Sequence, residues 1–203
     1  MEKKTFGYAL CGSYCTFRPA IGAMRRIAEK GHSLLPVMSF NAFSTDTRFG
    51  LAEDFVCEIE DICGSKVIAT IPGAEPIGPK RLVDLMIVSP CTGNTLGKLA
   101  NGITDTPVTM AVKSCLRVGL PVLLALATND ALAASASNLG RLLNTKNIYF
   151  VPMLQDSPEK KPFSLVADFS LVYPAAVAAL EGKQLRPVFL TLEPEKNEAK
   201  SPV

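Results

Sequence analysis

Short runs of apolar residues alternate along this chain with longer segments in which apolar residues recur every three or four positions. The short runs are typical of strands that are buried on both faces of a sheet. The longer segments are typical of helices that pack one face on such a sheet. Strands are predicted at 6–11, 34–38, 67–70, 85–88, 120–126 and 148–151. Helices are predicted at 19–30, 49–63, 92–103, 106–116, 132–143 and 164–180.

Prolines refine these predictions. Pro36 places the second strand near a sheet edge or at a bulge, and Pro90 ends the strand at 85–88, because proline has no N–H to donate. Pro174 is expected to kink or split the last helix. The segment 71–79 contains three prolines and two glycines, so it is expected to be a loop long enough to cover a site.

The alternation of strands and helices predicts the fold class. At least five alternations indicate an α/β fold: a three-layer, doubly wound, mostly parallel sheet with helices on both faces, Rossmann-like or flavodoxin-like. A mixed, charged loop is expected at 153–162. We expect one domain over residues 1–192 and a loose, charged C-terminal tail over 193–203.

The rest of the chain is organised around the stretch 84–102. A buried strand there runs into a tight polar turn, and Thr92, or Cys91 with Thr92, is a candidate cap for the helix that follows. The first N–H groups of a helix have no partner within it, and the helix dipole adds partial positive charge. Such a turn is suited to a phosphate or another anion. The alternative interpretation is an ordinary capped helix.

Polar loops follow four of the predicted strands. They are 12–13, 39–45, 92–95 and 128–130. Because the carboxyl ends of parallel strands meet at one edge of a sheet, these loops are expected to converge there. Four polar loops at one edge favour a pocket for a phosphate-bearing molecule over simple helix capping.

Composition and charge exclude several classes of protein. Hydrophobic residues make up 48% of the 203 residues and charged residues 20%, so a sizeable core is expected and wholesale disorder is not. The net charge of +2 is too balanced for a partner that is a nucleic acid or a membrane surface. No apolar run approaches the roughly 20 residues that span a bilayer. The N-terminus leads straight into a strand, which does not resemble a secretory signal and favours a cytoplasmic protein.

The sequence offers little conventional catalytic chemistry. The six cysteines form no CxxC pair and there is one histidine, so they are interpreted as reduced residues and no metal site is assigned. The GxGxxG fingerprint, the phosphate-loop lysine and the GxSxG elbow are absent. His32 is predicted away from the polar edge, Cys91 is interpreted as packed filler, and Asp130 and Glu75 as solvated loop acids. No catalytic residue is assigned.

One motif carries a family resemblance. Residues 89–105, Ser-Pro-Cys-Thr-Gly-Asn-Thr-Leu-Gly-Lys-Leu-Ala-Asn-Gly-Ile-Thr-Asp, resemble the signature turn and helix of the flavin-binding cysteine decarboxylases, a group that includes the flavin prenyltransferases. Ser39 and the strand at 121–129 also match this group, and the resemblance covers roughly residues 5–190. With Leu-Arg-Pro at 185–187, the pattern is most similar to the B chains of dipicolinate synthases from spore-forming bacteria.

The resemblance implies a function and a site. In the B-chain group, a separate nicotinamide-dependent A chain is the partner, the product is pyridine-2,6-dicarboxylate, and NAD(P) binds only through that A chain. The resemblance also implies a homo-oligomer and FMN as a possible cofactor. The residues that match the flavin or phosphate cradle, with Thr128 from the fourth polar loop, are Gly12, Ser13, Ser39, Thr92, Asn94, Thr95 and Thr128.

The sequence also departs from the group at three places. The decarboxylase histidine is replaced by Pro76, the substrate clasp by 127–130, and an arginine of the prenyltransferases by Met110, with Lys113 one turn on. Oxidative decarboxylation of a peptidyl cysteine is therefore not expected. Three interpretations stay open: a flavin-type subunit needed for dipicolinate formation during sporulation, a scaffold whose vestigial pocket binds only an anion, and an active decarboxylase or prenyltransferase.

Overall fold

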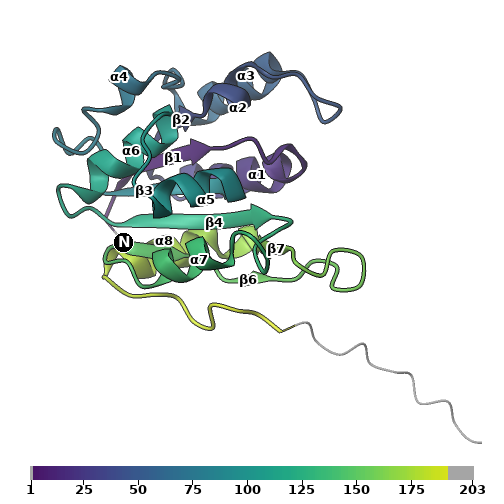
Figure 1. The fold of residues 1–203 in the computed structure, drawn as a ribbon. Coiled ribbons are helices and arrows are strands. Elements are labelled where there is room, and N and C mark those ends of the chain that lie inside the picture. Colours follow the sequence, from purple (N-terminus) through teal and green to yellow (C-terminus); the bar gives the residue numbers. More distant parts are fainter. Residues whose placement is uncertain (1, 192–203) are drawn as a thin grey trace, which may run out of the picture.

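The computed structural model describes residues 2–191 and shows one seven-stranded sheet flanked by helices (Figure 1). The strand order is β2-β1-β3-β4-β7-β6, and β5 pairs with β4. β1 to β5 are parallel, whereas β7 runs antiparallel to β4 and β6. The strands are β1 (Thr5–Leu10), β2 (Ser33–Met38), β3 (Leu85–Cys91), β4 (Val122–Thr128), β5 (Ile148–Phe150), β6 (Met153–Leu154) and β7 (Leu165–Ala167).

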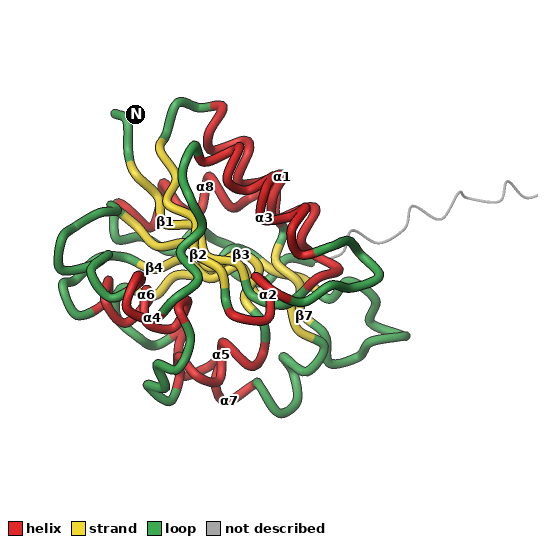
Figure 2. The backbone as a smooth tube through the Cα atoms, turned by 90° about the horizontal axis from the view of Figure 1, so that it is seen from above, coloured by secondary structure: helices red, strands yellow, loops and turns green. Residues whose placement is uncertain are grey.

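The helices form a layer on each face of the sheet (Figure 2). On one face lie α1 (Phe17–Glu29), α3 (Ala52–Cys63) and α8 (Val172–Leu180); on the other lie α4 (Ile71–Ala74), α5 (Gly93–Ala100), α6 (Pro107–Leu116) and α7 (Ala136–Leu143). The short helix α2 (Phe40–Ser44) follows β2, and 3-10 turns occupy Tyr14–Thr16 and Phe169–Leu171. The predicted α/β fold with a mostly parallel sheet is confirmed.

The central strands are apolar throughout because both of their faces are covered. In β1, Phe6, Tyr8 and Leu10 pack with α1 and α8, whereas Ala9 packs with the helices of the opposite face. This two-sided burial gives the continuous apolar runs seen in the sequence. The edge position predicted for β2 from Pro36 is also confirmed, since β2 ends the strand order.

The predicted end of the strand at 85–88 is wrong. β3 continues through Pro90 to Cys91, and its register against β4 shifts between Val88 and Cys91. The missing N–H of Pro90 falls within this irregular stretch, while its carbonyl oxygen accepts a hydrogen bond from the Cys11 N–H at 3.2 Å. Proline is tolerated where the regular ladder is already interrupted.

The C-terminal third differs most from the prediction. The segment 164–180 was expected to be a closing helix, kinked or split at Pro174, but β7 and a 3-10 turn precede α8, which begins at Val172. Pro174 lies in the first helical turn, where its missing N–H costs little, so it produces no kink. The strand at 148–151 is not the last, because β6 follows it inside the expected loop at 153–162.

Smaller differences concern element ends and one predicted strand. The segment 67–70 makes only a single bridge, from Ile68 to Val37, and the polar segment after β2 contains α2. α3 and α7 begin at Ala52 and Ala136, later than predicted, and α5 ends at Ala100. Residues 193–203, expected to be a loose tail, lie outside the described residues. Within residues 2–191, no helix has both the length and the apolar character to cross a membrane.

Candidate functional site

Two adjoining hollows lie beyond the carboxyl ends of the central strands. Gly12, Thr92 and Asn94 line both of them. The larger hollow, about 640 Å³, also contains Ser13 and Thr128. The smaller hollow, about 340 Å³, also contains Ser39 and Thr95. The four polar loops therefore converge at one edge of the sheet, as the sequence predicted, and all seven candidate residues line this double cavity. That they hold a cofactor stays a prediction.

The N-terminus of α5 forms the floor shared by the two hollows. Thr92 caps the helix, and its side-chain oxygen accepts from the Thr95 N–H at 3.2 Å. Within residues 2–191, the backbone N–H groups of Gly93 and Asn94 donate to no protein atom. A helix N-terminus with unpaired N–H groups favours an anion. The turn predicted from the sequence is therefore present, and two of its backbone N–H groups remain available to bind a ligand.

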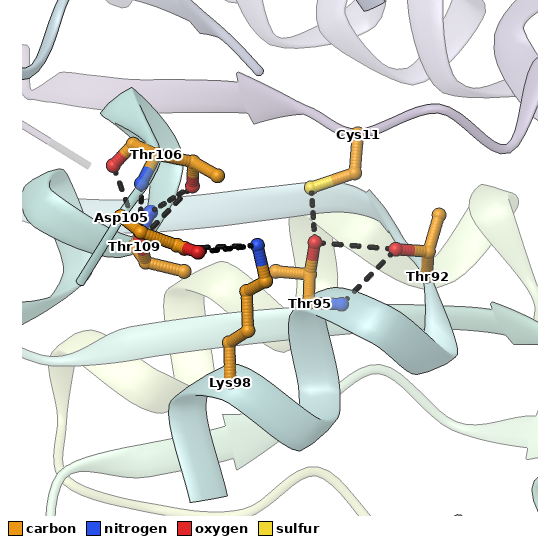
Figure 3. Close-up of polar contacts among 7 residues, drawn as sticks. All are labelled: Cys11, Thr92, Thr95, Lys98, Asp105, Thr106 and Thr109. Atoms are coloured by element: carbon orange, nitrogen blue, oxygen red, sulfur yellow. Dashed lines mark hydrogen bonds and ion pairs between the residues drawn. The ribbon is translucent and has the colours of Figure 1, made fainter. Parts of the chain in front are cut away.

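The hydroxyl groups of Thr92 and Thr95 are committed to the protein itself (Figure 3). Thr92 Oγ1 donates to Thr95 Oγ1 at 3.2 Å, and Thr95 Oγ1 donates to Cys11 Sγ, also at 3.2 Å. This chain of hydrogen bonds ties α5 to the end of β1. Burial raises the pKa of the Cys11 thiol to about 11, although the Thr95 hydrogen bond opposes that rise. Cys11 is therefore a neutral acceptor and not a nucleophile.

Other polar side chains keep a proton free for a ligand. Thr16 Oγ1 donates to the Ser13 carbonyl oxygen at 2.8 Å and also lies 3.0 Å from Ser13 Oγ, so neither contact uses the Ser13 hydroxyl proton. Ser39 Oγ accepts from the Ala42 N–H at 3.3 Å, which leaves the Ser39 proton available as well. The Asn94 side chain is exposed in both hollows. These three side chains can donate to an anion without breaking the structure.

Thr128 is held by a carboxylate behind α5. Its hydroxyl donates to Asp130 Oδ1 at 2.6 Å, and Ser135 Oγ lies 3.0 Å from both Asp130 oxygens. A Cβ atom on Gly93 would lie 2.6 Å from Thr128 Oγ1 and 2.9 Å from Asp130 Oδ1. Gly93 is therefore required for the close approach of α5 to this network. Asp130 is a structural acid and not the solvated loop acid that was expected.

Three charged residues of the cavity, Lys98, Asp156 and Lys161, were not expected there from the sequence. Lys98 lines the smaller hollow, and its ammonium lies 2.8 Å from Asp105 Oδ1; this hydrogen bond holds the pKa of Asp105 below its usual value. Lys98 follows Asn94 by four residues, so helical spacing would have placed both on one face. Asp156 and Lys161 line the larger hollow. No local signal pointed to them, because their loop resembled any charged surface loop.

Several residues considered in the sequence lie elsewhere. His32 is buried between the Lys4 N–H, 3.2 Å from Nδ1, and the Tyr173 hydroxyl, 3.2 Å from Nε2. Cys91 is fully buried, and burial raises its pKa well above the usual thiol value, which confirms its interpretation as packed filler.

The residues that replace the decarboxylase and prenyltransferase groups also lie outside the cavity. Pro76 and Met110 line neither hollow, and Lys113 lines a separate groove. The loop at 71–79 does not cover the cavity as expected. It packs on α6 instead, where the Gly78 N–H donates to Ser114 Oγ at 3.1 Å. Among the described residues, no group of three or more His, Cys, Asp or Glu side chains could hold a metal ion.

Comparison with known proteins gives a consistent set of relatives. The model of the family described as Flavoprotein matches residues 2–170. The chain is 43% identical over 190 residues to the dipicolinate synthase B chain of Bacillus subtilis (strain 168), covering 94% of this chain and 95% of the relative. A crystal structure of the dipicolinate synthase B chain from Bacillus halodurans matches with 40% identity and a TM-score of 0.85, covering 93% of this chain and 96% of the other.

A more distant structure extends the likeness of the fold. The FMN-dependent cysteine decarboxylase TvaF, from thioviridamide biosynthesis, is 23% identical with a TM-score of 0.58. The match covers 88% of this chain and 98% of TvaF. At this level of identity the comparison supports the shared three-layer architecture alone.

Proposed function

This chain belongs to the flavoprotein family, and we propose that within this family it acts as the second chain of a dipicolinate synthase. In this proposal it works in the cytoplasm with a separate nicotinamide-dependent A chain, and the pair forms pyridine-2,6-dicarboxylate during sporulation. The observation that carries the proposal is the 43% identity to a dipicolinate synthase B chain over 94% of this chain. The absence of a GxGxxG fingerprint disfavours a nicotinamide site in this chain. The family resemblance implies that the A chain carries the nicotinamide cofactor.

The cavity fits FMN as the proposed cofactor. The smaller hollow suits the phosphate, because it offers the free Ser39 proton, the Asn94 amide and the Lys98 ammonium. When bound, FMN would supply hydride or electron transfer. The protein's own part is to orient it through hydroxyl, amide and ammonium groups.

A homo-oligomer is part of the proposal. Phe40, Phe43, Phe49 and Leu51 follow β2 and expose between 39% and 54% of their surface. Phe40 lines the smaller hollow directly. Exposed aromatic residues beside a binding cavity favour burial against another chain. A second copy of this chain would cover them and complete the wall of the cavity.

Decarboxylation of a peptidyl cysteine is not proposed. Pro76 replaces the histidine of the decarboxylases, and it has no titratable group and lines neither hollow. The segment 127–130 replaces their substrate clasp, and Asp130 there is engaged by Thr128 and Ser135.

The test is reconstitution with the A chain. We expect the rate of pyridine-2,6-dicarboxylate formation to rise when this chain is added to a purified A chain, and an equal rate without it would refute the proposal. Flavin is tested separately, by absorbance of the purified chain and by titration with FMN. Asn94→Ala should weaken FMN binding, whereas Asn144→Ala, at the end of α7, should not. A chain that stimulates the A chain without binding FMN would establish the scaffold interpretation instead.

A further inference from the structure

The larger hollow has one cation among the described residues that line it. Lys161 reaches this cavity from the segment 155–164, between β6 and β7. Its ammonium lies 2.9 Å from Asp156 Oδ2, and the two side chains are 49% and 33% exposed. Both side chains are partly exposed, so water and ligands can reach the ammonium.

The backbone around Lys161 is fixed. The Lys161 N–H donates to the Ser157 carbonyl oxygen at 2.7 Å, and Gln155 Nε2 donates to the Pro162 carbonyl oxygen at 2.8 Å. The Leu132 N–H donates to the Phe163 carbonyl oxygen at 3.0 Å, which ties the segment to the turn after β4. Because these hydrogen bonds hold the backbone in place, Lys161 stays beside the cavity when its ammonium leaves Asp156 for a ligand.

The remaining walls suit a flat, acidic heterocycle. Ala127 and Val166, from β4 and β7, supply apolar surface. Ser13 and Asn94 supply donors from other elements, and the free N–H groups of Gly93 and Asn94 lie at the start of α5. A cation and a separate group of neutral donors within one cavity match a molecule with two carboxylates.

We propose that Lys161 is the residue that binds one carboxylate of the pyridine-dicarboxylate-type acid in the larger hollow, and that Asp156 holds its ammonium while the cavity is empty. The second carboxylate faces Ser13, Asn94 and the start of α5. This inference rests on the proposed function, because it takes its ligand class from the dicarboxylate product. The ligand competes with Asp156 for the same ammonium, so Asp156 opposes binding.

Two substitutions with opposite expected effects test this competition. Lys161→Gln should weaken binding of pyridine-2,6-dicarboxylate to the full chain by about tenfold, the loss expected for a charge-assisted hydrogen bond of about 1.4 kcal/mol. Asp156→Asn should strengthen binding by a few-fold, because it frees the ammonium. Lys160→Gln, at the exposed neighbouring position, should leave the affinity unchanged. Isothermal titration calorimetry measures all three.

Each other outcome overturns the proposal. No binding of the dicarboxylate to the unsubstituted chain, or equal affinity in Lys161→Gln, removes the assigned contact. Weaker binding in both Lys161→Gln and Asp156→Asn shows that the ion pair serves only to hold the segment in place.

The assay with the A chain separates the two proposals. If this chain stimulates dicarboxylate formation and Lys161→Gln leaves the KM unchanged, the assignment of Lys161 fails while the proposed function stands. If this chain does not stimulate the A chain at all, the proposed function fails.

Discussion

The hydroxyl of Thr95 donates a hydrogen bond to the thiol of Cys11 across 84 positions of sequence, at 3.2 Å. Cys11 follows β1 and Thr95 lies in the first turn of α5, so this bond joins two elements that frame the smaller hollow. Thr92 donates to Thr95 in turn. The polar motif of α5 therefore serves two purposes: some of its groups build the cavity, and others remain free to bind.

Thr95→Val should destabilise the protein by about 1–2 kcal/mol, because it leaves Thr92 Oγ1 without its acceptor in a partly buried place. Urea unfolding followed by circular dichroism measures the change. Thr95→Ser keeps the hydroxyl and should lose less stability than Thr95→Val. If the two variants were equally stable, the hydrogen-bonded chain would have no role in stability. Because Thr95→Val is expected to destabilise the protein, a loss of FMN binding in this variant would not by itself show that Thr95 contacts the ligand.

Gly93→Ala should destabilise the protein by about 1–3 kcal/mol, because the new Cβ atom would meet Thr128 Oγ1 at 2.6 Å and Asp130 Oδ1 at 2.9 Å. Gly140→Ala is the matched control: it lies in α7, and a Cβ atom there has no neighbour within 4 Å. That control should gain about 0.5–1 kcal/mol, from the better helix propensity of alanine. Thermal unfolding of both variants would contradict the packing argument if Gly93→Ala unfolded at the higher temperature.

Stability should fall as the pH drops below the usual histidine pKa of 6.5. Burial, with help from the Lys30 charge, holds the pKa of His32 below that value in the folded protein, so the unfolded chain binds the proton first. The contribution of His32 is present above pH 6.5 and is lost as the pH falls toward the folded-state pKa. Protonation would also remove the Nδ1 acceptor of the Lys4 N–H.

His32→Gln should reduce this pH dependence, since glutamine does not titrate. Urea unfolding of both proteins on either side of pH 6.5 measures the difference. Identical pH profiles would show that other groups cause the effect.

A thiol reagent should label Cys15 and Cys57 in the folded protein and spare Cys11, Cys91 and Cys115. The first two are exposed, whereas the other three are buried and burial raises their thiol pKa values. Mass spectrometry after brief alkylation identifies the sites. Cys15 lines the larger hollow, so pyridine-2,6-dicarboxylate should slow its labelling and leave that of Cys57 unchanged. Equal effects on both thiols would argue against a ligand in that hollow.

The sequence by itself determined the parts that depend on near neighbours. The apolar runs gave the five parallel strands because both faces of those strands are covered. The helix caps at Thr92 and Thr106 could be predicted, because each side chain accepts a hydrogen bond from an N–H only three residues further along the chain. The convergence of the four polar loops followed from the rule that parallel strands end at one edge.

Only the tertiary structure decided the rest. β6 and β7 have two and three residues, too few to show the hydrophobic pattern by which a strand is predicted. They form because β7 pairs with β4 and β6 pairs with β7. Whether a hydroxyl proton is free also depends on distant partners: Thr95 is committed to Cys11, whereas Ser39 is not committed. Lys161 reached the cavity only because that antiparallel pair carries it there. Contacts between residues far apart in the chain leave no local pattern, so the sequence could place the cavity but not say which of its groups can bind.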